Sequence, residues 1–265
     1  MNRVLPGVAL AICWLFLLLK GSVALFAAVI IPGLAIGAYE YGRMVLSAES
    51  FLRLVLFTIL AILPILSVFF TPQFGVGGGL VLGFLLLSFW TLTTYREGFD
   101  SYGFFSHCCL GLVWVGFLGA HLLMLRGLPD GNSWLLILTG ITAGSDSGAY
   151  YSGRAFGRHK LSPLISPNKT IEGAVGGMLA GMAVASLLAV LLLDTVPWLF
   201  VLLSAVVLAL LGICGDLTES VIKRATGTKD SGTILGGHGG ILDRADSMLF
   251  AAPTLYYLLL LFSVL

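Results

Sequence analysis

Long apolar stretches alternate with short polar ones along the whole chain. Nine of them are long enough to cross a bilayer as α-helices, at residues 4–19, 21–39, 51–70, 74–94, 105–125, 132–150, 173–192, 196–215 and 248–265. Gly173, Gly177 and Gly181 repeat every four residues and indicate close helix packing. Range 4–19 follows Arg3 as a signal peptide would, but no small-x-small cleavage pattern follows it. The pattern therefore predicts an all-α polytopic membrane protein of about nine transmembrane helices.

Composition narrows the class of protein further. The chain of 265 residues is 58% hydrophobic and only 10% charged, against about 25% charged residues in a soluble domain. Its mean hydropathy is +1.03. These values exclude a soluble enzyme and a disordered chain, and a net charge of +1 is too small for a nucleic-acid binder. The four cysteines lie in apolar context without metal-ligand spacing, so we interpret them as buried thiols without disulfides.

The basic residues predict the orientation of the chain in the membrane, because Lys and Arg are enriched in cytoplasmic loops. With nine spans and a cytoplasmic N-terminus, only Lys20 and Arg126 of the 14 basic residues lie outside. The pattern therefore predicts that the N-terminus is cytoplasmic and that the C-terminus is outside.

The charges also divide the chain into a scaffold and a region that carries chemistry. Residues 1–130 hold about five spans with short loops, whereas residues 131–265 include two polar cytoplasmic segments, 151–172 and 216–247. These two segments contain eight of the inside basic residues. We therefore predict a catalytic C-terminal transmembrane region. Carboxylates at one membrane face and the absence of an internal repeat do not favour a transporter.

The second segment, 216–247, begins as a continuation of the eighth apolar range. Asp216, Ser220 and Lys223 recur at helical spacing and share one face. Glu219 and Lys223 are spaced for an i,i+4 ion pair. Gly227 is predicted to end the helix.

The loop beyond that helix is rich in glycine, so its backbone N–H groups can approach an anionic ligand. Asp243 and Asp246 follow, three residues apart on one helix face. Together with Asp216 they suit Mg²⁺, which takes one or two carboxylates and leaves positions for phosphate and water. The alternative is that each aspartate is ion-paired at the interface, with Arg244 or Lys223 as partner.

The first segment, 151–172, follows Asp146, an ionisable residue inside the predicted end of the sixth span and hence a functional candidate. Ser166 and Pro167 are typical of an N-cap with proline at the first helical position. The N–H groups of that turn, with Lys169 beside them, predict a phosphate site. A plain helix start with a basic flank would explain Lys169 but not Asn168, Thr170 or Glu172.

Three stretches carry a family resemblance. Residues 220–246, with their lysines, glycine-rich loop and Ile241-Leu242-Asp243-Arg244-Ala245-Asp246 ending, resemble the signature of the phosphatidate cytidylyltransferases, also called CDP-diacylglycerol synthases. Residues 146–151 and 165–173 resemble a second region of that family.

The resemblance implies transfer of CMP from CTP to phosphatidic acid, giving CDP-diacylglycerol and pyrophosphate, on the cytoplasmic face of the cell membrane. It implies Mg²⁺, with a second cation and a homodimer left open. The metal ligands it implies are Asp216, Asp243 and Asp246. The catalytic and phosphate-neutralising residues it implies are Lys223, Arg224, Lys229, Asp230, His238 and Arg244. The substrate-binding residues it implies are Asp146, Ser166, Asn168, Lys169, Thr170 and Ser220. A polyprenol kinase and a synthase acting on an ether-linked phosphatidate analogue remain as alternatives.

Overall fold

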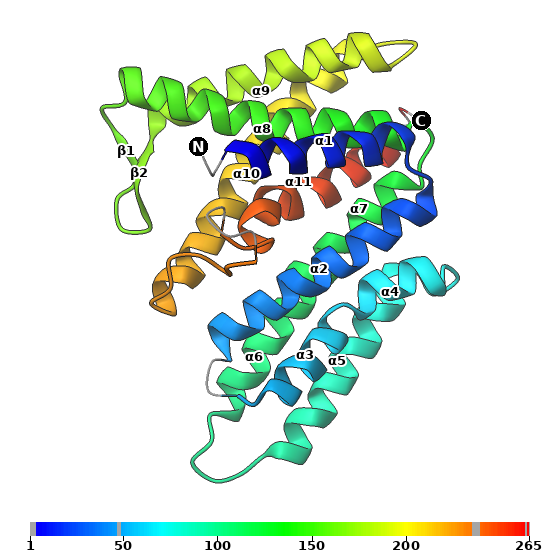
Figure 1. Ribbon diagram of the computed structural model, residues 1–265, viewed down its shortest axis with the longest axis vertical. Helices are drawn as coiled ribbons and strands as arrows, with labels where there is room; N and C mark the ends of the chain where they lie inside the picture. Colours follow the sequence, from blue (N-terminus) through cyan, green and yellow to red (C-terminus); the bar gives the residue numbers. More distant parts are fainter. Residues whose placement is uncertain (1–3, 47–48, 235–238, 263, 265) are drawn as a thin grey trace. The chain divides into compact units, whose positions relative to one another are not determined.

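The computed structural model describes residues 4–46, 49–234, 239–262 and 264 (Figure 1). A helix or a broken helix stands at each predicted apolar range of this part of the chain. The helical elements are α1 (Val4–Lys20), α2 (Val23–Val45), α3 (Phe51–Ala61), α4 (Leu63–Phe70), α5 (Gly75–Thr94), α6 (Ser101–Gly111), the π-helix η1 (Leu112–Phe117), α7 (Leu118–Arg126), α8 (Gly131–Phe156), α9 (Ile171–Leu192), α10 (Trp198–Ala225) and α11 (Leu242–Leu261). The strands are β1 (Lys160–Ser162) and β2 (Ser166–Thr170).

The helices have the length and composition of membrane spans. Among the described residues, five helical segments are long and apolar enough to cross a membrane: α2, α5, the continuous α6–α7 segment, α9 and α10. Helices α3 and α4 make a sixth if they are counted as one span, bent by 46°. Pro64 in the first turn of α4 explains that bend, because it cannot donate a hydrogen bond back into α3. The protein is thus a predominantly α-helical, polytopic membrane protein, as predicted.

The chain forms two compact units. One contains Met1–Met124 and Ala225–Arg244, and the other contains Leu125–Arg224 and Ala245–Leu265. The glycine-rich loop and the first turn of α11 therefore belong to the unit of N-terminal helices, and the rest of α11 belongs to the unit that contains α8, α9 and α10.

Close helix contacts in the first unit depend on glycine. A Cβ at Gly79 of α5 would lie 2.5 Å from the carbonyl oxygen of Leu63 and 2.6 Å from Cα of Pro64. A side chain there would force α4 and α5 apart. Large side chains elsewhere on α5, such as Leu85 and Phe89, are exposed, as expected for a helix with a lipid-facing side.

In the second unit, α8 and α9 lie side by side along their length (Figure 1). The predicted glycine repeat of α9 faces α8, and a Cβ at Gly177 would lie 2.6 Å from the carbonyl oxygen of Ser145. The buried residues of α9 are all small, whereas Leu179 and Leu187 are exposed. Small residues at the helix contact and large apolar ones outside are typical of packing in lipid.

The segment between α8 and α9 corrects the prediction of a helix start at Ser166. Strands β1 and β2 pair there in antiparallel register, Lys160 with Thr170 and Ser162 with Ser166. Helix α9 is capped instead by Thr170, whose Oγ1 accepts a hydrogen bond of 3.1 Å from the backbone N–H of Gly173. The fixed φ of Pro167 suits an extended strand as well as a first helical turn, and pairing with β1 decides between them.

Candidate functional site

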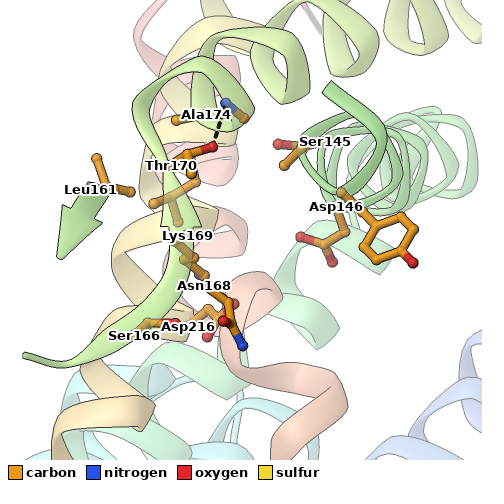
Figure 2. A pocket seen from close by; sticks show the side chains of 13 residues that line it. Ser145, Asp146, Leu161, Ser166, Asn168, Lys169, Thr170, Ala174 and Asp216 are labelled. Atoms are coloured by element: carbon orange, nitrogen blue, oxygen red, sulfur yellow. Dashed lines mark hydrogen bonds and ion pairs between the residues drawn. The ribbon is translucent and has the colours of Figure 1, made fainter. Parts of the chain in front are cut away.

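A pocket of about 360 Å³ with charged and polar residues in its lining lies in the second unit, where α8, α9, α10 and the β-hairpin meet. Figure 2 shows Asp146 pointing from α8 towards β2, which carries Ser166, Asn168 and Lys169 along the pocket wall. Asp216 lines the pocket from α10. With Thr170, which also lines the pocket, the structure therefore brings together six predicted site residues from segments far apart in the sequence.

An ion pair joins two walls of the pocket. Nζ of Lys169 lies 2.5 Å from Oδ2 of Asp216, and both side chains keep partial access to solvent, 26% and 34% exposed. The hydroxyl of Ser220, one turn further along α10, donates a 3.4 Å hydrogen bond to Oδ1 of the same aspartate. A lysine held by a single carboxylate in an open pocket retains donors for a ligand, since an ammonium group has three.

A third carboxylate, Asp246 of α11, lies within electrostatic reach of Asp216. It lies before the apolar part of its helix and is 8% exposed, and its Oδ1 accepts a 2.6 Å hydrogen bond from the Ser247 N–H. Burial raises the pKa of Asp246 well above its usual range, and the negative charges of Asp216 and Asp146 raise it further. The carboxylates of Asp216 and Asp146 therefore lie close enough to Asp246 to disfavour its charged form.

The donor set of this cluster fits magnesium bound together with phosphate. Among the described residues, no three His, Cys, Asp or Glu side chains converge on one point as a complete metal cage. Magnesium does not need such a cage, because one or two carboxylates hold it and phosphate oxygens and waters fill the other positions. Asp216 and Asp246 could supply those carboxylates.

Two further basic residues of α10 have defined partners. Lys223 forms the predicted i,i+4 ion pair with Glu219, at 2.6 Å, and Glu219 is 1% exposed. Nε of Arg224 donates a 3.3 Å hydrogen bond to the carbonyl oxygen of Ile165 in the hairpin. Glu219 thus holds the Lys223 ammonium group in place. Arg224 joins the end of α10 to the turn just before β2, the strand that carries Lys169.

Asp243 has a different environment, in the first unit. Its Oδ2 accepts hydrogen bonds from the backbone N–H of Ser231 at 3.0 Å, the Ser231 hydroxyl at 2.9 Å and the N–H of Gly240 at 2.7 Å. Three donors on one oxygen define the direction of the carboxylate.

The remaining predicted residues lie in the loop and at helix ends. Lys229 and Asp230 are exposed in the loop after α10, and Arg244 is exposed in the first turn of α11. His238 lies outside the described residues. Thr170 lines the pocket, but its hydroxyl oxygen caps α9.

Glu40 is a buried acidic residue that was not among the site residues predicted from the sequence. This residue is 3% exposed near the end of α2, and its Oε2 accepts a 3.0 Å hydrogen bond from the backbone N–H of Leu242. The predicted span ends at residue 39, one position before Glu40, whereas α2 continues to Val45. A carboxylate inside the helix would have identified it as a functional candidate.

A helical membrane protein with one lysine and two carboxylates in the lining of a pocket is suited to bind a phosphate-bearing ligand together with a cation. The model of the cytidylyltransferase family matches residues 1–262 of this chain. The chain is 35% identical over 270 residues to the phosphatidate cytidylyltransferase of Bacillus subtilis, covering 99% of this chain and 98% of that protein. It is 36% identical over 251 residues to that of Pseudomonas aeruginosa, covering 92% and 90%. It is 41% identical over 184 residues to that of Staphylococcus epidermidis, covering 69% and 68%.

The chain belongs to the cytidylyltransferase family. It is therefore a nucleotidyltransferase that uses CTP, and the family resemblance of the three polar stretches is confirmed.

Proposed function

We propose that this protein is a phosphatidate cytidylyltransferase, which joins CMP from CTP to phosphatidic acid and releases pyrophosphate. The observation that carries the proposal is the pocket in which Lys169, Asp216 and Asp146 meet, in a chain of the cytidylyltransferase family. The relatives from Bacillus subtilis and Pseudomonas aeruginosa are named for this activity, and their similarity covers 99% and 92% of this chain.

The reaction needs charge neutralisation more than covalent catalysis. A phosphate oxygen of phosphatidic acid attacks the α-phosphorus of CTP, the bond from that phosphorus to the bridging oxygen breaks, and pyrophosphate leaves. Lys169 neutralises phosphate charge in the pocket, and Asn168 and Ser166 beside it offer hydrogen bonds. Lys223 and Arg224 add positive charge along α10.

Magnesium would reduce the negative charge that builds up between the two substrates. Asp216 and Asp246 would hold it in the second unit, and Asp243 is a separately proposed metal ligand in the first unit. The excess negative charge around Asp246 supports a cation at this position, because a buried carboxylate next to two others is costly without one.

The location of the substrates supports a site at the cytoplasmic membrane surface. CTP comes from the cytosol, and the headgroup of phosphatidic acid lies at the interface with its acyl chains in lipid. We propose nine spans, with a cytoplasmic N-terminus, an external C-terminus and the pocket on the inner face of the cell membrane. The excess of basic residues in the predicted inside loops supports this topology.

Reporter fusions test the topology. A reporter that is active only in the cytoplasm should be inactive when fused after residue 265 and active when inserted in the exposed loop at Lys229 and Asp230. Activity of the C-terminal fusion would contradict nine spans with the N-terminus inside.

The activity is tested with purified protein in detergent and CTP labelled in its cytidine. Labelled CDP-lipid should form only when phosphatidic acid and Mg²⁺ are both present, and pyrophosphate should appear in equal amount. Release of CDP with phosphorylation of a polyprenol would instead identify a lipid kinase. An ether-linked phosphatidate analogue, assayed in parallel, shows whether the acyl linkage matters.

A further inference from the structure

Glu40 of α2 lies against the loop that leads into α11, far from it in sequence. Its Oε2 accepts hydrogen bonds from the N–H of Leu242 at 3.0 Å and from the hydroxyl of Ser231 at 3.4 Å. Both donors lie within the first unit and belong to the segment that carries Asp243. A helix of the N-terminal half therefore contacts the proposed catalytic segment directly.

The loop is shaped to the Glu40 carboxylate. A Cβ at Gly240 would lie 2.5 Å from Oε2, and a Cβ at Gly232 would clash with Oε1. The side chain of Leu242, 1% exposed, lies over Gly37 on the same helix. A side chain at either of these two loop positions would therefore have to displace the Glu40 carboxyl group, whatever the ligand of the loop.

Glu40 also shares a partner with Asp243. The Ser231 hydroxyl lies 2.9 Å from Oδ2 of Asp243 and 3.4 Å from Oε2 of Glu40. The backbone N–H groups of Ser231 and Gly240 also donate hydrogen bonds to Oδ2 of Asp243. Moving Glu40 would release Leu242 and alter the loop that aims the Asp243 carboxylate.

We propose that Glu40 is a positioning residue: it holds the Leu242 N–H and the surrounding loop from α2, and thereby fixes the direction of the Asp243 carboxylate. Glu40 acts through Asp243 and does not itself contact CTP, lipid or metal. The role of Asp243 as a metal ligand rests on the proposed function. The hydrogen bond between Glu40 and the loop does not depend on that function.

Hydrogen exchange of the purified protein, without CTP or added metal, tests the hold on the loop. In Glu40→Ala, a peptide containing Leu242 should exchange roughly 10- to 100-fold faster than in the wild type, because the Leu242 N–H loses its acceptor, Oε2 of Glu40. Glu40→Gln keeps a carbonyl oxygen at the same reach and should retain most of the protection. Glu49→Ala is the matched control, since Glu49 pairs with Arg53 at 2.6 Å and not with the loop.

Activity assays on the same variants test the consequence for catalysis. Glu40→Ala should lower kcat by about tenfold or more and raise the Mg²⁺ concentration for half-maximal activity, with a smaller effect on KM for CTP. Glu40→Gln and Glu49→Ala should stay near the wild type. A merely structural role would lower the melting temperature and leave the Mg²⁺ dependence unchanged.

Several outcomes would overturn the proposal. Unchanged exchange at Leu242 in Glu40→Ala would show that Glu40 does not hold the loop. Loss of activity in Glu40→Gln with normal exchange would show that the charge itself is needed. If Glu40→Ala does not fold, Ser231→Ala replaces it, because the Ser231 hydroxyl contacts both Glu40 and Asp243. Normal Mg²⁺ dependence in that variant would contradict the proposal. Absence of cytidylyltransferase activity in the wild-type protein would refute the proposed function. The exchange result would then still test whether Glu40 holds the loop.

Discussion

Asp246→Asn is expected to lower kcat for CDP-lipid formation by about 10²- to 10³-fold, because it removes a carboxylate from the proposed magnesium site. The neutral amide keeps the size of the side chain but binds Mg²⁺ weakly. Raising the Mg²⁺ concentration should restore only part of the activity. Labelled CTP, phosphatidic acid and purified protein in detergent suffice for the measurement.

The same substitution should leave the protein folded. Asp246 is 8% exposed, and its pKa is raised by burial and by the negative charges of Asp216 and Asp146. Replacing it with a neutral residue removes this repulsion, so the melting temperature without magnesium should equal or exceed that of the wild type. Asp194→Asn, the same change at an exposed loop position of the same unit, should alter neither property. Near-normal turnover in Asp246→Asn would remove this residue from the metal site.

The helices were predictable because lipid imposes a simple rule on sequence. Every backbone polar group must be satisfied within a span, so long apolar ranges become helices wherever they occur. Small residues every four positions on α9 likewise predicted a close helix contact, and the structure shows that α8 is the partner. These features depend on neighbours within a few helical turns, and a single sequence contains that information.

Features that depend on distant partners were not predictable in the same way. Ser166 and Pro167 satisfied the local rule for a helix start, but pairing with β1 extended this segment, and Thr170 caps the helix instead. Glu40 lies 202 residues before its partner Leu242, and no local pattern connects them. The charged residues of the candidate pocket were found because charges are scarce in this chain, but which of them pair was only visible in the structure.

Polar residues also explain why α8 and α11 are not among the apparent spans, whereas α1 is left out because it is short. Helix α8 carries Asp146 and Arg154 near its end, and α11 begins with Asp243 and Asp246, so neither has the uniform apolar composition of α9. The helices that line a site in a membrane protein exchange apolar residues for functional ones. Helices α8 and α11 are two of the nine spans that we propose, and we infer that their ends contribute to the site.

Lys169→Met is expected to lower kcat/KM for CTP by roughly 10- to 100-fold, since it removes a charge-assisted contact to phosphate from the pocket. Lys160→Met is the matched control, because Lys160 lies on the paired strand of the same hairpin, is exposed and does not line the pocket.

The kinetic pattern separates two roles for Lys169. If Lys169 binds CTP phosphate in the ground state, KM for CTP rises in Lys169→Met and kcat changes less. If it serves only to neutralise Asp216, its partner at 2.5 Å, then Asp216→Asn should restore the activity of Lys169→Met. We expect no such rescue, because Asp216 is also a proposed metal ligand. Lys169→Arg retains the positive charge and should keep part of the activity, whereas an unchanged KM for CTP in Lys169→Met would contradict a contact between Lys169 and the nucleotide.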